Sequence, residues 1–304
     1  MALGESTAAA VEESGVHPPI PDRTKRAFWW LERFAPGIGA RWATELWCTV
    51  PDVDLSTKMP PGLPASTPIE ASWDGHHIAG ESWGDGPLVY LVHGWGGCRA
   101  HMAVFVKPLV AEGYRVIAFD LPSHNDSEPG ALAPGRSTIV ECAEAVRAVM
   151  ATHGPAHAVV GHSLGAKAAA LAMARGAQSD RLVFLAPMGR FNWYLDVFAE
   201  RHGFGPRIRN RMHRRLSRRI GMPLLDTDID RLADQAGNRP LLIVHDPDDP
   251  DSPHADSEQT VAVWPGARLE TTRGLGPLAH YRILRHRPAI TAAVGFIGSS
   301  KAIG

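Results

Sequence analysis

The stretch Val160–Lys167 reads V-G-H-S-L-G-A-K, with a serine between two glycines. The apolar run that ends at Val160 is typical of a buried strand, and the alanine-rich run after Leu164 is typical of a helix. Gly-X-Ser-X-Gly at a strand-to-helix junction forms a strained turn that lifts the serine Oγ above the sheet, and only small neighbours such as Gly161 and Gly165 fit beside it. The stretch predicts that Ser163 is a nucleophile, not a hydroxyl in an ordinary tight turn.

Strands and helices alternate on both sides of this turn. Unbroken apolar runs, typical of strands covered on both faces, occur at 88–92, 116–119, 156–160, 182–186 and 241–244. Helical patterns occur at 102–112, 139–152, 164–175, 257–264 and 289–297. This alternation predicts the α/β fold class, with a mostly parallel sheet and helices on both of its faces.

The chain divides into three predicted parts. Residues 1–22 are small and polar and predict a disordered lead-in. Residues 23–68 predict an amphipathic helix broken near Pro36, followed by a proline-rich connector, and residues 69–304 predict the main domain. The apolar stripe of the helix either packs on the body of the protein or forms a lid or interfacial segment that contacts lipid-like substrates. The stripe comprises Phe28, Leu31, Phe34, Ile38, Trp42 and Leu46.

Two segments of the main domain depart from the alternation. The runs I-E-A-S-W and H-I-A-G-E-S-W, joined by Asp74-Gly75, predict a hairpin at an antiparallel edge of the sheet. Residues from about 188 to 239 contain no strand-like run and predict a small helical cap. Their arginine-rich stretch, I-R-N-R-M-H-R-R-L-S-R-R at 208–219, is either a solvated helix face or a surface for an anionic substrate. In the first case Ile208, Met212, Leu216 and Ile220 turn inward.

Composition excludes several classes of protein. The 304 residues include 31 Lys and Arg against 32 Asp and Glu, so no overall charge favours a nucleic-acid partner. Cys48, Cys98 and Cys142 have neither disulfide-framework nor metal-type spacing, and we expect a reducing, cytoplasmic location. The N-terminus lacks the pattern of a signal peptide, and no apolar run reaches the roughly 18 residues of a transmembrane helix. The oligomeric state is left open.

A serine nucleophile needs a base and an acid that orients the base, and both follow the serine along this type of chain. The segment P-L-L-I-V-H-D-P-D-D-P-D-S-P, at 240–253, runs from a buried strand into an acidic loop, where open α/β sheets place their chemistry. Four aspartates compete as the acid, because any of them could instead cap a turn. They are Asp246, Asp248, Asp249 and Asp251.

The base is predicted in T-T-R-G-L-G-P-L-A-H-Y-R-I-L-R-H, at 271–286. His280 lies on a glycine-containing loop before a helix, and His286 is its rival. An oxyanion hole requires two backbone N–H groups, which we expect from Leu164 and from Trp95 in the glycine-rich loop L-V-H-G-W-G-G. That loop matches no phosphate-binding pattern, so we expect no cofactor and no metal.

With these motifs the chain resembles the α/β-hydrolase superfamily, and in particular bacterial alpha/beta fold hydrolases with an H-G-W-G-G loop and an ending like G-L-G-H-R-R-I-L-R. The resemblance covers roughly residue 69 to the C-terminus and implies an eight-stranded, mostly parallel sheet. Alignment of the family's G-X-X-D-X-X-V-P with D-P-D-D-P-D-S-P implies Asp249 as the catalytic acid. The ending implies His280 as the base, and F-D-L-P-S-H-N-D-S is similar to the family's F-D-x-P-G-H-G-x-S.

The chain departs from this family at three places. Ser123 and Asn125 stand where the family has glycines, at the expected mouth of the pocket. Lys167, in the Ala166-Lys167 pair after the elbow, is expected on the helix surface or against a charged substrate. Pro277-Leu278-Ala279 is inserted before His280, so that the loop either moves the imidazole or bulges outward and leaves it in place.

The resemblance implies a serine hydrolase that cleaves a small-molecule carboxylic ester or thioester through an acyl-enzyme. Ser163, His280 and Asp249 would form the triad, and the N–H groups of Leu164 and Trp95 would hold the oxyanion. An acyltransferase or a carbon–carbon bond hydrolase would use the same triad, and a noncatalytic ligand-binding protein is a third alternative. The serine argues against branches that use an aspartate nucleophile.

Overall fold

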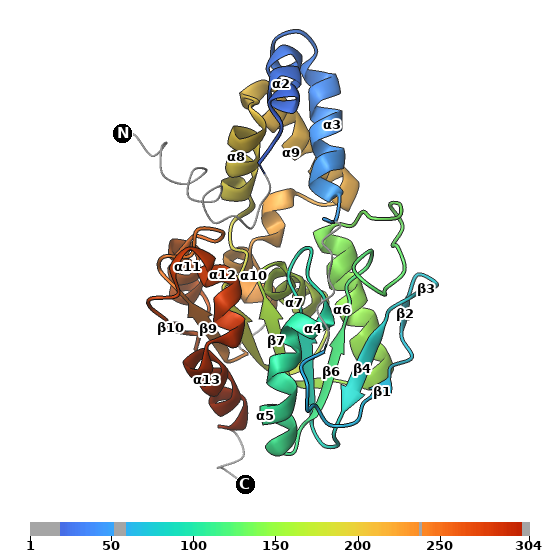
Figure 1. Ribbon diagram of the computed structural model, residues 1–304, viewed down its shortest axis with the longest axis vertical. Helices are drawn as coiled ribbons and strands as arrows, with labels where there is room; N and C mark the ends of the chain where they lie inside the picture. Colours follow the sequence, from blue (N-terminus) through green and yellow to red (C-terminus); the bar gives the residue numbers. More distant parts are fainter. Residues whose placement is uncertain (1–18, 52–58, 237–238, 300–304) are drawn as a thin grey trace.

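An eight-stranded sheet forms the centre of the structure, a computed structural model that describes residues 19–51, 59–236 and 239–299 (Figure 1). The strands β6, β5, β7, β8, β9 and β10 are parallel, while β1 and β4 make an antiparallel edge. The mostly parallel sheet predicted from the alternation is therefore confirmed. In spatial order the strands are β1 (Thr67–Pro68), β4 (Gly80–Trp83), β6 (Arg115–Phe119), β5 (Leu88–Val92), β7 (Ala156–His162), β8 (Ser179–Leu185), β9 (Leu241–His245) and β10 (Arg268–Thr271).

The predicted hairpin is present, but its pairing differs from the expectation. Strands β2 (Ser72–Trp73) and β3 (His76–His77) form a separate two-stranded sheet. The turn residues Asp74 and Gly75 have φ angles of 51° and 81°, as a two-residue hairpin turn requires. The antiparallel edge of the main sheet is made by β1 and β4, and β4 is the second half of the predicted run H-I-A-G-E-S-W.

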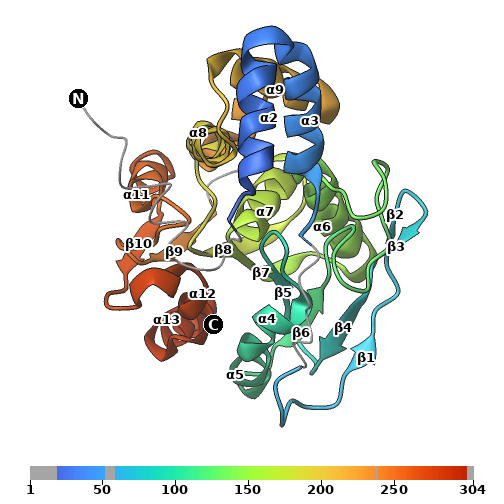
Figure 2. The ribbon, with the colours of Figure 1, turned by 45° about the horizontal axis from the view of Figure 1, so that its top comes forward.

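Helices cover both faces of the sheet, as Figures 1 and 2 show. Successive strand residues alternate between two cores: Val159 and Phe184 belong to one, Val160 and Val183 to the other. Both faces are buried, which is why the strands read as unbroken apolar runs. The helices of the main domain are α4 (Arg99–Met102), α5 (Val106–Ala111), α6 (Ile139–His153), α7 (Leu164–Ala174), α10 (Ile229–Ala236), α11 (His254–Val263), α12 (Ala279–Arg282) and α13 (Arg287–Gly298), with short 3₁₀ turns η1 (Ala103–Phe105), η2 (Leu224–Thr227), η3 (Gly276–Leu278) and η4 (Ile283–Arg285).

Four helices, which we call the cap, lie together beyond the carboxyl edge of the sheet, and two of them belong to the segment 188–239 predicted as a cap (Figures 1 and 2). They are α2 (Asp22–Phe34), α3 (Pro36–Cys48), α8 (Phe191–His202) and α9 (Pro206–Ile220). Phe28 stacks on Trp42 with ring centroids 4.3 Å apart, and a Cβ at Gly39 would lie 2.4 Å from the Ile208 side chain, so α9 packs tightly on α3. Ile208, Met212, Leu216 and Ile220 are buried, as the solvated-face interpretation of α9 requires.

The apolar stripe predicted for the N-terminal segment is buried or half-buried at four of its positions and exposed at two. Phe34 and Ile38 are exposed, because the chain reverses between α2 and α3 and both residues lie at that turn. The predicted lead-in lies outside the described residues up to 18, and α2 already begins at Asp22. In the part of the chain described, all three cysteines are buried and free, and no helix is long and apolar enough to cross a bilayer.

Candidate active site

The turn around Ser163 has the conformation that its glycines suggest. Strand β7 ends at His162, helix α7 begins at Leu164, and Ser163 between them has φ 52° and ψ −120°. This strained conformation is held by neighbours: the Ser163 N–H donates to the Leu185 carbonyl over 3.0 Å. A Cβ at Gly165 would lie 2.4 Å from the carbonyl oxygens of Val92 and His93, so only glycine allows α7 to begin here.

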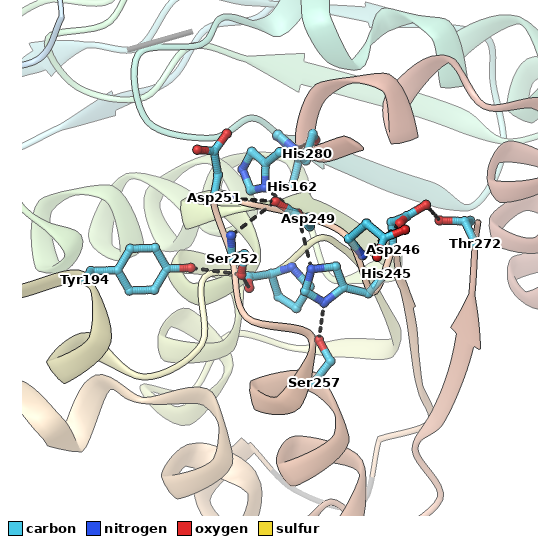
Figure 3. A network of polar contacts seen from close by, with 12 residues as sticks. His162, Tyr194, His245, Asp246, Asp249, Asp251, Ser252, Ser257, Thr272 and His280 are labelled. Carbon is cyan, nitrogen blue, oxygen red and sulfur yellow. Dashed lines mark hydrogen bonds and ion pairs between the residues drawn. The ribbon is translucent and has the colours of Figure 1, made fainter. Parts of the chain in front are cut away.

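Asp249 and His280 are hydrogen-bonded to each other. His280 Nδ1–H donates to Asp249 Oδ2 over 2.8 Å, and both side chains are buried (Figure 3). Asp249 lies in the loop after β9, and His280 lies in α12, so different elements bring them together at the carboxyl edge of the sheet. Since Asp249 occupies Nδ1, Nε2 is the ring nitrogen of His280 that remains to accept a proton.

The Asp249 carboxylate is held by four hydrogen bonds. Its Oδ2 also accepts from His245 Nε2–H at 3.2 Å, and its Oδ1 accepts from the N–H groups of Asp251 and Ser252 at 2.8 and 3.2 Å. Burial by itself would raise the pKa of Asp249, but the charges and hydrogen bonds of His280 and His245 outweigh it and hold this pKa well below its ordinary range. Asp249 is therefore an anion fixed in one orientation.

The other three aspartates of the loop have different surroundings. Asp246 accepts from the N–H of Asp248 at 3.0 Å and from the Thr272 hydroxyl at 3.1 Å, so it caps the turn after β9. Asp248 is exposed. Asp251 offers a carboxylate oxygen within 4.8 Å of ligand atoms of Asp249 and His280, which is the one such acid and histidine group among the described residues. As Asp249 and His280 already bond to each other, a metal there would have to break that bond.

His280 reaches this position despite the insertion before it. Gly276–Leu278 form the short turn η3, which leads directly into α12. His162 Nε2–H donates to the His280 carbonyl over 2.8 Å, so the residue before Ser163 contacts the loop of the histidine. Burial, together with the neighbouring charge of His280, lowers the pKa of His162 to about 3, which keeps it neutral. His286 lies elsewhere, as the residue that precedes α13.

The pKa of His280 is raised above its ordinary value. Burial opposes the charged imidazole, but the charge and hydrogen bond of Asp249 outweigh burial, and the charge of Asp251 adds to them. A proton taken up at Nε2 is therefore stabilised by carboxylates on the far side of the ring. This is the electrostatic arrangement that a general base needs when it must hold a proton transiently.

The glycine-rich loop lies beside Ser163. A Cβ at Gly94 would lie 3.0 Å from the Ser163 Cβ, which places the backbone of the loop against the elbow. His93 fixes the loop: its Nδ1–H donates to the Gly94 carbonyl at 2.7 Å, and its Nε2 accepts the Leu121 N–H at 2.9 Å. Within the described residues, neither the Trp95 N–H nor the Leu164 N–H donates to a protein acceptor.

The two residues that replace glycines in the 119–127 loop keep a glycine-like backbone. Ser123 has φ 63° and Asn125 has φ 43°, both in the left-handed region. Their side chains stabilise these conformations, because the Ser123 hydroxyl donates to the Arg136 carbonyl at 2.8 Å and Asn125 Nδ2 donates to Asp120 at 2.8 Å. The loop therefore follows a glycine-type path without glycine.

The expectation that Lys167 lies on the helix surface or against a substrate is wrong. Its side chain is fully buried, its Nζ donates to Asp228 Oδ1 at 3.0 Å and lies 4.1 Å from the centre of the Phe191 ring. Burial lowers the pKa of Lys167, and Asp228 opposes this shift. Because α10 packs against α7, this face of α7 is interior, and the ion pair joins α7 to the residue between η2 and α10.

Three polar residues near Asp249 were not singled out from the sequence. His245, the last residue of β9, donates to Asp249 and accepts from the Ser257 hydroxyl at 2.8 Å. Tyr194, on α8, donates to Ser252 at 2.9 Å, and Ser252 donates to the Pro187 carbonyl at 2.6 Å (Figure 3). A histidine at the carboxyl end of a strand was a usable signal for His245, whereas nothing local marked Tyr194. Through Tyr194 the cap contacts the acid loop directly.

Comparisons with known proteins agree with this architecture. The model of the alpha/beta hydrolase family matches residues 89–294. The structure is similar to an esterase from Exiguobacterium antarcticum, with 18% identity, a TM-score of 0.58 and coverage of 77% of this chain and 99% of that one. A search of curated protein sequences gives no significant match.

Two further solved structures have the same fold. A meta-cleavage product hydrolase from Pseudomonas fluorescens IP01 matches with 17% identity and a TM-score of 0.57, covering 78% of this chain and 98% of that one. A thioesterase domain from the curacin biosynthetic pathway matches with 18% identity and a TM-score of 0.54, covering 77% and 99%. At these identities the likeness concerns the fold, and the family match covers most of the chain. The sheet, the elbow and the family match together identify this chain as a member of the alpha/beta hydrolase family.

Proposed function

We propose that this protein is a serine hydrolase that cleaves a carboxylic ester or thioester through Ser163, His280 and Asp249. The observation that carries the proposal is the buried hydrogen bond between His280 Nδ1 and Asp249, together with the contact of the His280 carbonyl with His162, the residue before Ser163. A histidine oriented by a buried carboxylate is what a serine hydroxyl needs in order to act as a nucleophile at neutral pH.

The proposed reaction has two halves. In the first, Ser163 Oγ transfers its proton to His280 Nε2 and attacks the substrate carbonyl, and the N–H groups of Trp95 and Leu164 stabilise the oxyanion. The tetrahedral intermediate expels the alcohol or thiol, which takes the proton from His280. In the second half His280 deprotonates water, the hydroxide attacks the acyl-enzyme, and the acid is released while Ser163 regains its proton. The positive end of the α7 dipole at Leu164 favours both oxyanions.

The test is labelling by a fluorophosphonate probe, followed by turnover of p-nitrophenyl esters and acyl thioesters of increasing chain length. We expect the wild type to be labelled and active, and Ser163→Ala to be neither. His280→Ala is expected to lose activity, while His286→Ala serves as the matched control and keeps it. A wild type that is neither labelled nor active on any ester or thioester contradicts the proposal.

The same experiments address the alternatives that share the triad. An acyltransferase is labelled at Ser163 and transfers the acyl group to an added alcohol or amine faster than to water. A carbon–carbon bond hydrolase is labelled but cleaves vinylogous diketones in preference to esters. A noncatalytic binding protein is not labelled. The cytoplasmic location remains a prediction, for which fractionation of cells that produce the chain is the measurement.

A further inference from the structure

The end of the cap that is furthest from the sheet exposes a cluster of large apolar side chains. The structure describes six exposed large hydrophobic residues, and four of them are Trp29 (47% exposed), Trp30 (57%), Phe34 (71%) and Ile38 (65%), at or near the turn between α2 and α3. Trp30 stacks on Phe34 with ring centroids 5.1 Å apart. We call these four residues the distal ridge. Trp29 and Trp30 also contact each other, and Ile38 lies four residues beyond Phe34; exposed apolar residues gathered in this way mark an interaction surface.

A basic groove adjoins the distal ridge. A hollow of about 260 Å³ between α3 and α9 begins at Gly37, one residue before Ile38 of the ridge, and no carboxylate lines it. We call it the arginine groove. Its lining residues are Gly37, Ala40, Arg211, Arg214, Arg215 and Arg218. A second hollow of about 270 Å³, which shares Arg215 and Arg218, continues it toward Thr44 and Arg219.

Four arginines of the groove form no ion pair with a carboxylate of the described residues. In the described residues no carboxylate pairs with Arg211, Arg214, Arg215 or Arg218, and the buried Nε of Arg215 has no hydrogen-bond acceptor. The charge of Arg215 acts on the neighbouring Glu45, but Glu45 is bonded to Arg136 and Arg219. Four cations on one helix face repel one another, and an anion in the groove would relieve this repulsion.

We propose that the distal ridge and the arginine groove form a docking surface for an anionic phospholipid bilayer. Trp and Phe side chains of the ridge would enter the interface of the bilayer, and headgroup phosphates would bind in the groove. Aromatic residues beside arginines that form no ion pair among the described residues have the two properties that peripheral membrane binding requires.

The charge of this surface favours a bilayer over the other occupants. A second copy of the chain, packed face to face about a twofold axis, would bring the same unpaired arginines together. A small soluble anion would fill the groove but leave the distal ridge exposed to water. An anionic bilayer would neutralise the arginines of the groove and bury the apolar side chains of the ridge at the same time.

The docking surface is separate from the catalytic residues. Helix α3 is 13 residues long, about 20 Å, and leads from the distal ridge to Pro51, whose ring lies 3.2 Å from where a Cβ of Gly96 would be. Gly96 belongs to the loop that carries Trp95. Membrane binding therefore does not depend on Ser163, and Ser163→Ala should bind vesicles as the wild type does.

The test is co-sedimentation with vesicles of phosphatidylcholine alone and of phosphatidylcholine mixed with phosphatidylglycerol. The wild type should bind the mixed vesicles, bind phosphatidylcholine much more weakly, and dissociate at high salt. Arg214→Gln/Arg218→Gln should weaken binding about 30-fold, because each arginine near the surface contributes about a factor of five. Trp30→Ser/Phe34→Ser should weaken it at least about tenfold through the loss of buried apolar area.

Matched controls change exposed residues of the same type elsewhere. Val263→Ser on α11, and Arg268→Gln/Arg287→Gln on β10 and α13, should bind as the wild type does. Circular dichroism checks that each variant is folded. If Trp30→Ser/Phe34→Ser is not folded, Ile38→Ser replaces it.

Two results would overturn the proposal. One is a wild type that does not bind the mixed vesicles, and the other is binding that neither double variant weakens. In a wild type that does not bind vesicles, saturable binding of inorganic pyrophosphate would assign the surface to a soluble polyanion. Self-association that is lost in Trp30→Ser/Phe34→Ser would assign it to a second copy of the chain.

Discussion

Asp249 Oδ2 accepts hydrogen bonds from two histidines at once, His280 Nδ1 at 2.8 Å and His245 Nε2 at 3.2 Å. The first bond orients the proposed base, and the second holds the carboxylate from the opposite side. With the N–H groups of Asp251 and Ser252 on Oδ1, the carboxylate has no freedom to rotate. The geometry of the proposed base therefore depends on residues that never touch substrate.

The pH dependence of catalysis should reflect the raised pKa of His280. The base must be neutral, so kcat/KM should fall as pH decreases through a pKa above the ordinary value of about 6.5. Asp251→Asn removes one of the charges that raise this pKa, and the acid limb should move to lower pH. Asp248→Asn, in the same loop but exposed, is the control and should leave the limb in place. An unchanged limb in Asp251→Asn would contradict this electrostatic account.

His245 should matter for catalysis although it lies behind the acid. His245→Leu removes one donor to Asp249 and leaves the Ser257 hydroxyl without its acceptor. We expect kcat to fall about tenfold with little change in KM, and the free energy of unfolding to fall by about 1–3 kcal/mol. Ser257→Ala keeps the bond from His245 to Asp249 and should keep kcat within about twofold. Steady-state kinetics and urea unfolding measure both effects, and equal kcat losses in the two variants would argue against this role.

The buried pair of Lys167 and Asp228 should be costly to break from one side only. Lys167→Met leaves a buried carboxylate unpaired, and we expect the free energy of unfolding to fall by about 3–5 kcal/mol. Lys167→Met/Asp228→Asn removes both charges while the amide oxygen can still accept the Phe191 N–H, and most of the loss should be recovered. Urea unfolding of the two variants is the measurement, and a double variant no more stable than the single one would count against the pair.

The left-handed backbone at Ser123 gives a comparison between two substitutions. Both Ser123→Gly and Ser123→Ala lose the hydrogen bond to the Arg136 carbonyl, but only alanine keeps a Cβ at φ 63°. The glycine variant should therefore be more stable than the alanine variant by about 1 kcal/mol. Thermal or urea unfolding decides this, and equal stabilities would mean that the loop relaxes to another conformation.

The nucleophile elbow could be predicted from the sequence because its determinants are local. Gly161, Ser163 and Gly165 lie within five consecutive residues. A strand-to-helix turn leaves no room for side chains beside the serine, and this requirement is visible as two glycines at fixed spacing. The strands were predictable for a similar reason, because burial on both faces leaves unbroken apolar runs. The hairpin turn at Asp74-Gly75 follows from backbone preferences of two residues.

The rest depended on contacts between distant segments. Local pattern left four aspartates open as the acid, and only the fold brings Asp249 rather than its neighbours to His280 Nδ1. Lys167 was predicted on the helix surface or against a substrate, because nothing in the sequence of its own helix indicates that α10 packs on that face of α7.

Phe34 and Ile38 fitted a buried stripe, yet the reversal of the chain at Pro36 exposes both. The sequence by itself determined the fold class and the serine turn, since steric preference and hydrophobic period act within a few residues. The tertiary structure decided which aspartate bonds to which histidine and which apolar residues are exposed to water. Both depend on contacts between side chains that are distant in the sequence and come together only when the chain folds.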